Sequence, residues 1–137
     1  MASVLCPYVN FTGEARQALE FYRSVFGGTV AITTFGEFGI TDGVAADGVM
    51  HGQLKTPSGY TIMASDVPLD VPVGTTSNIT LSLTGDDADA LRGYFAGLAE
   101  GGTVGTPLTL QVWGDEYGQL TDRFGVSWLA NIATAED

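Results

Sequence analysis

The single histidine of this sequence, His51, is the residue whose chemistry points most directly to catalysis or ligand binding. It lies two residues before Gln53 in a segment that alternates with period two, so both side chains should project from one face of a strand. Imidazole titrates near neutrality, which suits a general acid or base. We therefore predict His51 as a candidate catalytic residue, while solvation or a structural hydrogen bond is the commoner role of a lone histidine.

The sequence has few residues that could form a metal site or act as a nucleophile. His51 could be one ligand, but transition-metal sites usually require more nitrogen or sulfur donors. We expect no cofactor, with a divalent metal ion as the alternative. The single cysteine, Cys6, would need a histidine partner and an electropositive setting to act as a nucleophile, so we predict a buried, inert thiol. The sequence has no Gly-Xaa-Ser-Xaa-Gly elbow and no P-loop lysine.

Charge and composition narrow the class of partner. The chain has 137 residues, of which 45% are hydrophobic, and a formal net charge of −11. Its length suits one folded domain with its own core. An acidic surface repels polyanions, so we expect neither nucleic acid nor an anionic membrane as a partner. A cationic ligand is compatible with this charge, while a surface that only keeps the protein in solution is the commoner explanation. One cysteine and no signal-peptide pattern predict a cytoplasmic protein, and no apolar run reaches the roughly 18 residues that span a bilayer.

Two stretches of the sequence occur twice in the same order. Gly27-Gly28-Thr29-Val30 returns as Gly101-Gly102-Thr103-Val104, and His51-Gly52-Gln53-Leu54 returns as Tyr117-Gly118-Gln119-Leu120. Such ordered matches indicate an internal duplication. The offset falls from 74 residues at the first match to 66 at the second, so the first module holds eight extra residues. We place them in the Gly- and Asp-containing segment Gly36 to Val49, a predicted loop of the length that often forms a lid.

The remaining patterns predict a β-α-β-β-β module in each half of the chain. Apolar residues at helical spacing predict helices at 13–26 and from 86 or 87 to about 100, each closed by glycine. Period-two alternation predicts strands at 5–11, 30–35, 50–55, 60–65, 78–84, 103–106, 109–113, 117–121 and 127–132, with 103–113 as one strand kinked at Pro107. The predicted fold class is therefore α+β, a single domain at 1–137 with module one at about 4–66, a linker at 67–76 and module two at about 77–133.

Polar residues fall on one face of several predicted strands, as they do when the other face packs on helices. A small-molecule site on these polar faces is one interpretation, and plain solvent exposure is the other. Trp113 and Tyr117 could wall such a site, whereas Trp128 alternates onto the helix-packing face and is expected in the core. The predicted ligand-binding residues are His51, Gln53, Asn78, Trp113, Tyr117, Gln119 and Asn131.

An ordered set of short motifs runs through both halves. It comprises Pro7-Tyr8-Val9-Asn10-Phe11, Ala18-Leu19-Glu20-Phe21-Tyr22, Phe26-Gly27-Gly28, Met50-His51 and Ser65-Asp66, then Gly101-Gly102, Pro107-Leu108, Trp113-Gly114, Tyr117-Gly118 and Asp122-Arg123-Phe124-Gly125-Val126 with Trp128 and Asn131. Over about residues 4–133 this set resembles PhnB-type proteins of the glyoxalase, bleomycin-resistance and dioxygenase (vicinal oxygen chelate) superfamily. The resemblance implies glyoxalase-like modules that curl into a cupped mixed sheet with flanking helices, a small-molecule ligand in the cup, and a homodimer.

In metalloenzymes of that superfamily, His, Gln or Glu side chains hold a divalent ion. Carried onto this sequence, the ligand positions fall on Pro7 and Leu129, which cannot ligate, and on Asn78 and Gln53, which are weak amide ligands. The resemblance therefore implies metal-free binding or sequestration of a small molecule. The alternatives are a metal-dependent or His51-assisted lyase, isomerase or dioxygenase, and an interaction module with a vestigial cup. Some family members bear a methyltransferase label, but no glycine-rich turn for a nucleoside cofactor follows a strand here, so we do not predict methyl transfer.

Overall fold

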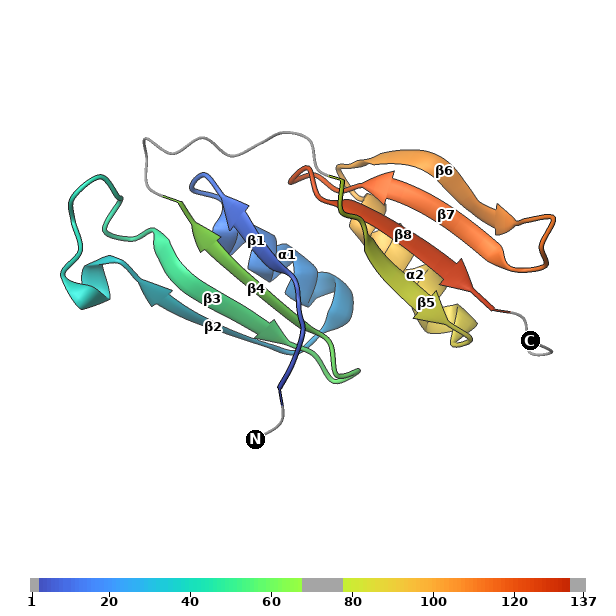
Figure 1. Cartoon of the computed structure of the whole chain (residues 1–137), viewed down its shortest axis with the longest axis horizontal. Helices are drawn as coiled ribbons and strands as arrows, with labels where there is room; N and C mark the ends of the chain where they lie inside the picture. Colours follow the sequence, from blue (N-terminus) through green and yellow to red (C-terminus); the bar gives the residue numbers. More distant parts are fainter. Residues whose placement is uncertain (1–2, 68–77, 134–137) are drawn as a thin grey trace. The chain divides into compact units, whose positions relative to one another are not determined.

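The computed structural model describes residues 3–67 and 78–133 and divides the chain into two compact units, Met1–Gly74 and Thr75–Asp137 (Figure 1). We call these units module one and module two. Each contains one four-stranded mixed sheet and one long helix, which confirms the predicted α+β class. Residues 68–76 of the predicted linker lie outside the described residues, as does residue 77, the predicted start of module two.

Module one follows the predicted β-α-β-β-β order. Its elements are β1 (Tyr8–Phe11), α1 (Ala15–Phe26), β2 (Thr29–Thr34), a short 3₁₀ helix η1 (Gly36–Phe38), β3 (Val49–Lys55) and β4 (Thr61–Asp66). The strands lie in the order β1-β4-β3-β2, with β1 parallel to β4 and the other neighbours antiparallel. The segment between β2 and β3, where the sequence placed the extra residues, consists of η1 and loop.

Helix α1 forms because its apolar residues return at helical spacing and cover one face. The buried residues of the helix are those of the predicted stripe, namely Ala15, Ala18, Leu19, Tyr22 and Phe26. The helix stops at Gly27, which has a φ of 76° and whose amide donates to the carbonyl of Arg23 at 2.7 Å. A positive φ at this point suits glycine, as predicted.

A buried carboxylate joins this helix to the sheet. Asp66 ends β4 and is nearly inaccessible to solvent. Its Oδ1 accepts the amide of Ala15 at 2.9 Å, and its Oδ2 accepts the amide of Val49 at 3.0 Å. The first of these amides is one that a helix start leaves without an intrahelical partner. Asp66 therefore fixes the start of α1 and the start of β3, two residues before His51.

Module two repeats the arrangement. Its elements are β5 (Leu81–Gly85), α2 (Ala88–Ala99), β6 (Thr103–Leu110), β7 (Glu116–Thr121) and β8 (Ser127–Ile132), and its strand order is β5-β8-β7-β6. Leu91, Phe95 and Leu98 of the predicted stripe form the buried face of α2, while Ala88, its fourth predicted member, is only half-buried. Over the described residues, no helix is both long and apolar enough to cross a membrane.

The repeated glycines of the two central strands lie directly against a helix. A Cβ added to Gly52 of β3 would lie 2.5 Å from Cδ1 of Leu19. One added to Gly118 of β7 would lie 2.9 Å from Cζ of Phe95 and 2.8 Å from Cα of Leu108 in β6. Each strand therefore has a glycine where a helical side chain needs the space. The sequence duplication is thus also a duplication of packing.

Two strands begin three residues later than predicted. β1 starts at Tyr8, and Leu5 before it is fully exposed. β5 starts at Leu81, which corrects the predicted start at Asn78. The physical reason is the length of the partner strand, because β8 begins at Ser127 and offers no paired residue to Asn78. Asn78 is exposed and lies outside the sheet.

The kinked strand of module two is only partly as predicted. β6 continues through Pro107 as one strand with two irregularities of register, as expected. It ends at Leu110, however, which pairs with Glu116 of β7. The short turn between them contains Trp113, so the prediction of Trp113 as a strand residue is wrong.

Candidate functional site

The polar face of the first sheet is built by alternation along its strands. Ile62, Ala64, Leu54 and Gly52 are buried, as expected of the face that packs on α1. The opposite face, which we call the open face of module one, consists of Tyr8, Asn10, Thr33, His51, Gln53, Met63 and Ser65, with Lys55 at the end of β3. Strand pairing places Tyr8 beside Met63 and Met63 beside Gln53, so residues far apart in sequence form one row.

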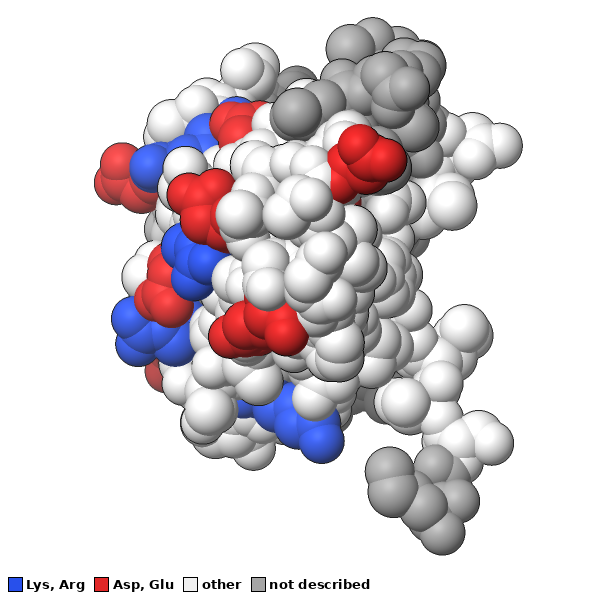
Figure 2. All heavy atoms as spheres, turned by 90° about the vertical axis from the view of Figure 1, so that its left-hand side faces the viewer, with Lys and Arg blue, Asp and Glu red and all other residues white. Residues whose placement is uncertain are grey.

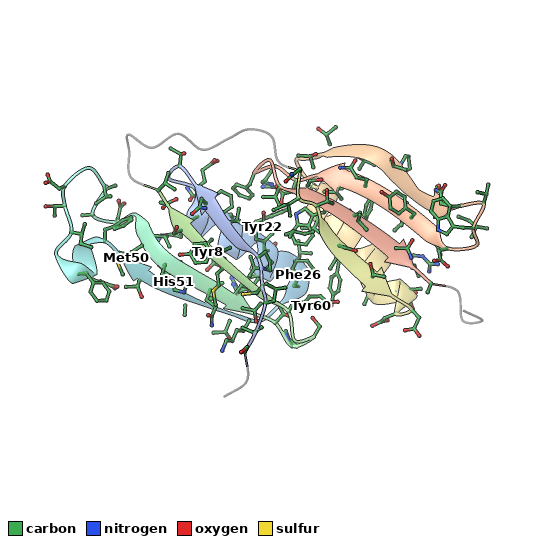
Figure 3. All side chains as sticks on the ribbon, in the orientation of Figure 1. Tyr8, Tyr22, Phe26, Met50, His51 and Tyr60 are labelled. Carbon is green, nitrogen blue, oxygen red and sulfur yellow. The ribbon has the colours of Figure 1, made fainter. Side chains whose placement is uncertain are left out.

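Tyr8 and His51 are in contact on this open face. The Tyr8 hydroxyl lies 3.2 Å from Nδ1 of His51, and the ring centroids are 5.7 Å apart (Figure 3). Tyr8 is 47% exposed and His51 is half-buried, so both rings are accessible. If the hydroxyl donates to Nδ1, the imidazole proton lies on Nε2, which becomes a hydrogen-bond donor toward a ligand.

A second pair on the same face also presents a donor. The Ser65 hydroxyl donates to Oδ1 of Asn10 at 3.3 Å, which leaves the Asn10 amide nitrogen for other partners.

Most residues of this face are uncharged although the chain carries a net charge of −11. Figure 2 shows charged side chains gathered mainly along one side of the view, beside a broad area of uncharged atoms.

The equivalent face of the second sheet, the open face of module two, consists of Ser82, Thr84, Tyr117, Gln119, Leu129 and Asn131. Asn131 is paired in register with Tyr117, and its Nδ2 donates to Oδ2 of Asp115 at 3.0 Å. Gln119 donates from Nε2 to the Ser127 hydroxyl at 3.3 Å. Both amide groups are therefore oriented by hydrogen bonds within the module.

An aromatic pair lies at one end of this second face. The rings of Trp113 and Tyr117 are 6.0 Å apart and inclined at 66°, an edge-to-face arrangement. Trp113 is 58% exposed, so its ring is available to a ligand. Trp128, in contrast, is 3% exposed and donates from Nε1 to Oδ2 of Asp122, which confirms its predicted place in the core.

An ion pair of module two lies on the other side of this sheet. Arg92 of α2 contacts Glu116 through two hydrogen bonds, one of them from Nε at 3.1 Å. The hydrogen bond from Arg92 is the main cause that lowers the pKa of Glu116, and the same bond raises the pKa of Arg92. Glu116 pairs with Ile132, which is buried, so this carboxylate belongs to the helix side of the sheet.

The structure assembles most of the predicted site residues in two groups. His51 and Gln53 share the open face of module one, while Trp113, Tyr117, Gln119 and Asn131 lie on or beside that of module two; Asn78 belongs to neither. Sequence reasoning missed Tyr8, Met63 and Asp115 as site residues. The signal for Tyr8 was its alternation with Asn10 in a motif already noted, but the pairing of β1 with β4 could not be read from it.

The donor set does not fit a divalent metal ion. Pro7 and Leu129 supply no ligand atom, and Gln53 supplies a neutral amide. Within residues 3–67 and 78–133, no three His, Cys, Asp or Glu side chains come together in a group that could hold a metal. Such sites need three or four donors, so no chemical step is assigned to a metal here.

Comparison with known proteins agrees with this architecture. Residues 3–130 match the family model described as 3-demethylubiquinone-9 3-methyltransferase. The chain is 34% identical to the protein PA1353 of Pseudomonas aeruginosa, with a TM-score of 0.83 over 97% of this chain and 99% of that one. It is 26% identical to the PhnB protein of Bacillus cereus, with a TM-score of 0.79 over 96% and 100%. A glyoxylase/bleomycin resistance protein/dioxygenase domain from Frankia shares the fold alone, at 12% identity and a TM-score of 0.66 over 97% and 98%. The predicted PhnB-like resemblance and glyoxalase-like fold are confirmed.

Proposed function

This chain belongs to the family described as 3-demethylubiquinone-9 3-methyltransferase, and from that premise we propose that it binds a small molecule on the open faces of its modules, without a metal ion. The observation that carries the proposal is the contact of Tyr8 with His51 on the open face of module one. It combines an accessible aromatic surface with an oriented imidazole. Ligand sites commonly have this make-up, in which apolar surface supplies affinity and a few polar groups fix orientation.

The neighbouring residues support binding of a group that accepts hydrogen bonds. Met63 lies between Tyr8 and Gln53 in one row and offers an adaptable apolar surface. Asn10 presents an amide nitrogen, and His51 presents Nε2 when Tyr8 donates to Nδ1. A ligand with a planar apolar body and a carbonyl-type oxygen would match both properties.

Acid–base catalysis is a second candidate, favoured by the same contact. A hydrogen bond at Nδ1 orients the imidazole. In its imidazolium form, with Nδ1 donating to the Tyr8 hydroxyl, His51 could deliver the proton on Nε2 to a bound substrate and become a neutral imidazole. A metal-free lyase or isomerase could use such a proton donor. Methyl transfer, which the family description names, is not part of the proposal, because the sequence has no glycine-rich strand-to-helix turn for a nucleoside cofactor.

Native mass spectrometry of freshly purified, untagged protein is the first test. We expect the mass of a homodimer carrying an organic adduct and no stoichiometric divalent ion. One divalent ion per chain would contradict the proposal. A protein without adduct would also contradict it if neutral phenols and amides change neither its melting temperature nor its His51 resonances.

The adduct is then added back to stripped protein and followed by NMR. Because His51 is the only histidine, its imidazole resonances need no assignment by mutation. Tyr8→Phe and His51→Gln should each weaken binding about fivefold or more, the value of one hydrogen bond. Ser24→Ala, on the exposed side of α1, is the control and should leave affinity unchanged. Conversion of the compound that His51→Gln abolishes, with binding retained, would establish the catalytic alternative.

A further inference from the structure

The two open faces offer opposite hydrogen-bonding groups. On module two, the amide nitrogen of Asn131 is taken by Oδ2 of Asp115 at 3.0 Å. The amide oxygen of Asn131 therefore points away from Asp115 and is the group that can meet a ligand. On module one, by contrast, Asn10 has its oxygen taken by Ser65 and presents its nitrogen. Module two thus presents an acceptor where module one presents a donor.

The aromatic pair of module two also favours a positively charged ligand. The edge-to-face contact of Trp113 with Tyr117 forms a corner with one strongly exposed indole. The faces of aromatic rings carry partial negative charge and attract cations, tryptophan most strongly. Tyr117 is paired in register with Asn131, so the corner and the amide oxygen are neighbours on one surface.

The charges around this corner favour a cation as well. Asp115 brings a carboxylate to the turn that also carries Trp113, and the amide of Gln111 donates to the Asp115 carbonyl at 2.8 Å, which closes that turn. The arginines of module two are held elsewhere, Arg92 by Glu116 and Arg123 by the carbonyl of Glu100. The net charge of −11 adds a long-range attraction for cations.

We propose that the open face of module two recognises an organic ammonium group, held in the corner that the Trp113 and Tyr117 rings form and hydrogen-bonded to the Asn131 oxygen beside Asp115. The proposal deepens the proposed function, on which it rests, by giving the ligand a charge. An ammonium is preferred to a metal ion because the corner offers ring faces and an amide rather than a set of anionic ligands.

Benzylamine at pH 7, where it is protonated, and benzyl alcohol are the matched probes. The readout is the indole N–H resonance of Trp113. Trp128 is the internal reference, because its indole is buried and bonded to Asp122. We expect the ammonium to bind about tenfold more tightly than the alcohol and to weaken as salt is added.

Two variants and a control sharpen the test. Asp115→Asn can still accept a bond from Asn131 but removes the charge, so it should reduce the tenfold preference to about threefold or less. Trp113→Leu lacks the reporter indole, so its affinities are measured by isothermal titration calorimetry, and the preference should be abolished. Asp86→Asn, an exposed carboxylate before α2, is the charge-matched control and should leave it intact. All three variants retain Trp128, and an unchanged Trp128 resonance verifies that each of them is folded.

The outcomes separate this inference from the proposed function. Equal affinity for the two probes, or no response of Trp113 to either, overturns the ammonium site. If His51 still responds to the re-added adduct, the small-molecule function of module one stands. If neither His51 nor Trp113 responds to any compound, both proposals fail.

Discussion

Replacement of Asp122 by alanine should destabilise the protein far more than the equivalent change in module one. Asp122 and Thr56 are 66 residues apart and open equivalent turns, between β7 and β8 and between β3 and β4. In both turns the opening residue bonds through its main chain to residues three and four positions later. The turns differ in the side chain. Asp122 accepts three hydrogen bonds while Thr56 accepts one main-chain amide, from Tyr60.

The magnitude follows from what each truncation leaves behind. Oδ1 of Asp122 accepts the amides of Phe124 and Val126 at 2.9 and 3.1 Å, and Oδ2 accepts the buried indole of Trp128 at 2.9 Å. A buried donor without a partner costs about 1–3 kcal/mol, and a donor that water can reach costs less. We therefore expect Asp122→Ala to lower the free energy of unfolding by about 3 kcal/mol. Thr56→Ala, in an exposed turn, should lower it by about 0.5–1 kcal/mol.

Urea unfolding at pH 7, followed by tryptophan fluorescence and circular dichroism, measures both variants. With a slope of about 2 kcal/mol/M, the midpoint should fall by about 1.5 M for Asp122→Ala and by less than about 0.5 M for Thr56→Ala. Asp122→Asn should lie between wild type and alanine, because one amide oxygen can still accept. Equal losses at the two positions, or an Asp122→Ala variant within about 1 kcal/mol of wild type, would refute the reasoning.

Three further results are expected. Tyr8→Phe should shift the tautomer equilibrium of His51 away from the Nε2–H form by about fivefold, measured from the ¹⁵N shifts of the imidazole, and an unchanged ratio would show that the hydroxyl does not donate. Because Arg92 lowers the pKa of Glu116 below its ordinary 4.5, the pair stabilises the fold above that pH. The stability difference between wild type and Glu116→Gln should therefore shrink as pH falls below 4.5 in acid unfolding, and a constant difference would contradict it. Gly28→Ala should cost about 3 kcal/mol in thermal unfolding, because its Cβ would overlap a main-chain oxygen of β3; a change below about 1 kcal/mol would contradict that packing.

The framework of the fold could be predicted because its signals are local. The spacing of apolar residues from Ala15 to Phe26 gave the buried face of α1, and Gly27 gave its end. The repeated glycines gave the duplication. The ends of strands were predicted less accurately, as at Asn78. A strand extends only as far as its partner strand, and local sequence does not identify that partner.

The site depends on contacts that sequence patterns do not specify. Tyr8 and His51 are 43 residues apart and meet through the parallel pairing of β1 with β4. Asp66 and Asp122 lie in motifs noted from the sequence, but a carboxylate in a motif gives no sign that it is buried and bonded to main-chain amides. Trp113 was predicted as a wall of the site, yet in a strand rather than in a turn.

The two modules keep what folding requires and differ in what a ligand would meet. Gly52 and Gly118 occupy the same buried place against a helix, where any larger side chain would collide with it. On the open faces, one position carries His51 in module one and Tyr117 in module two. Packing does not determine which of these two side chains is present, because either one fits on an accessible face. Under the proposed function this difference sets what each module recognises, so binding measured at His51 does not test module two, which needs its own reporter at Trp113.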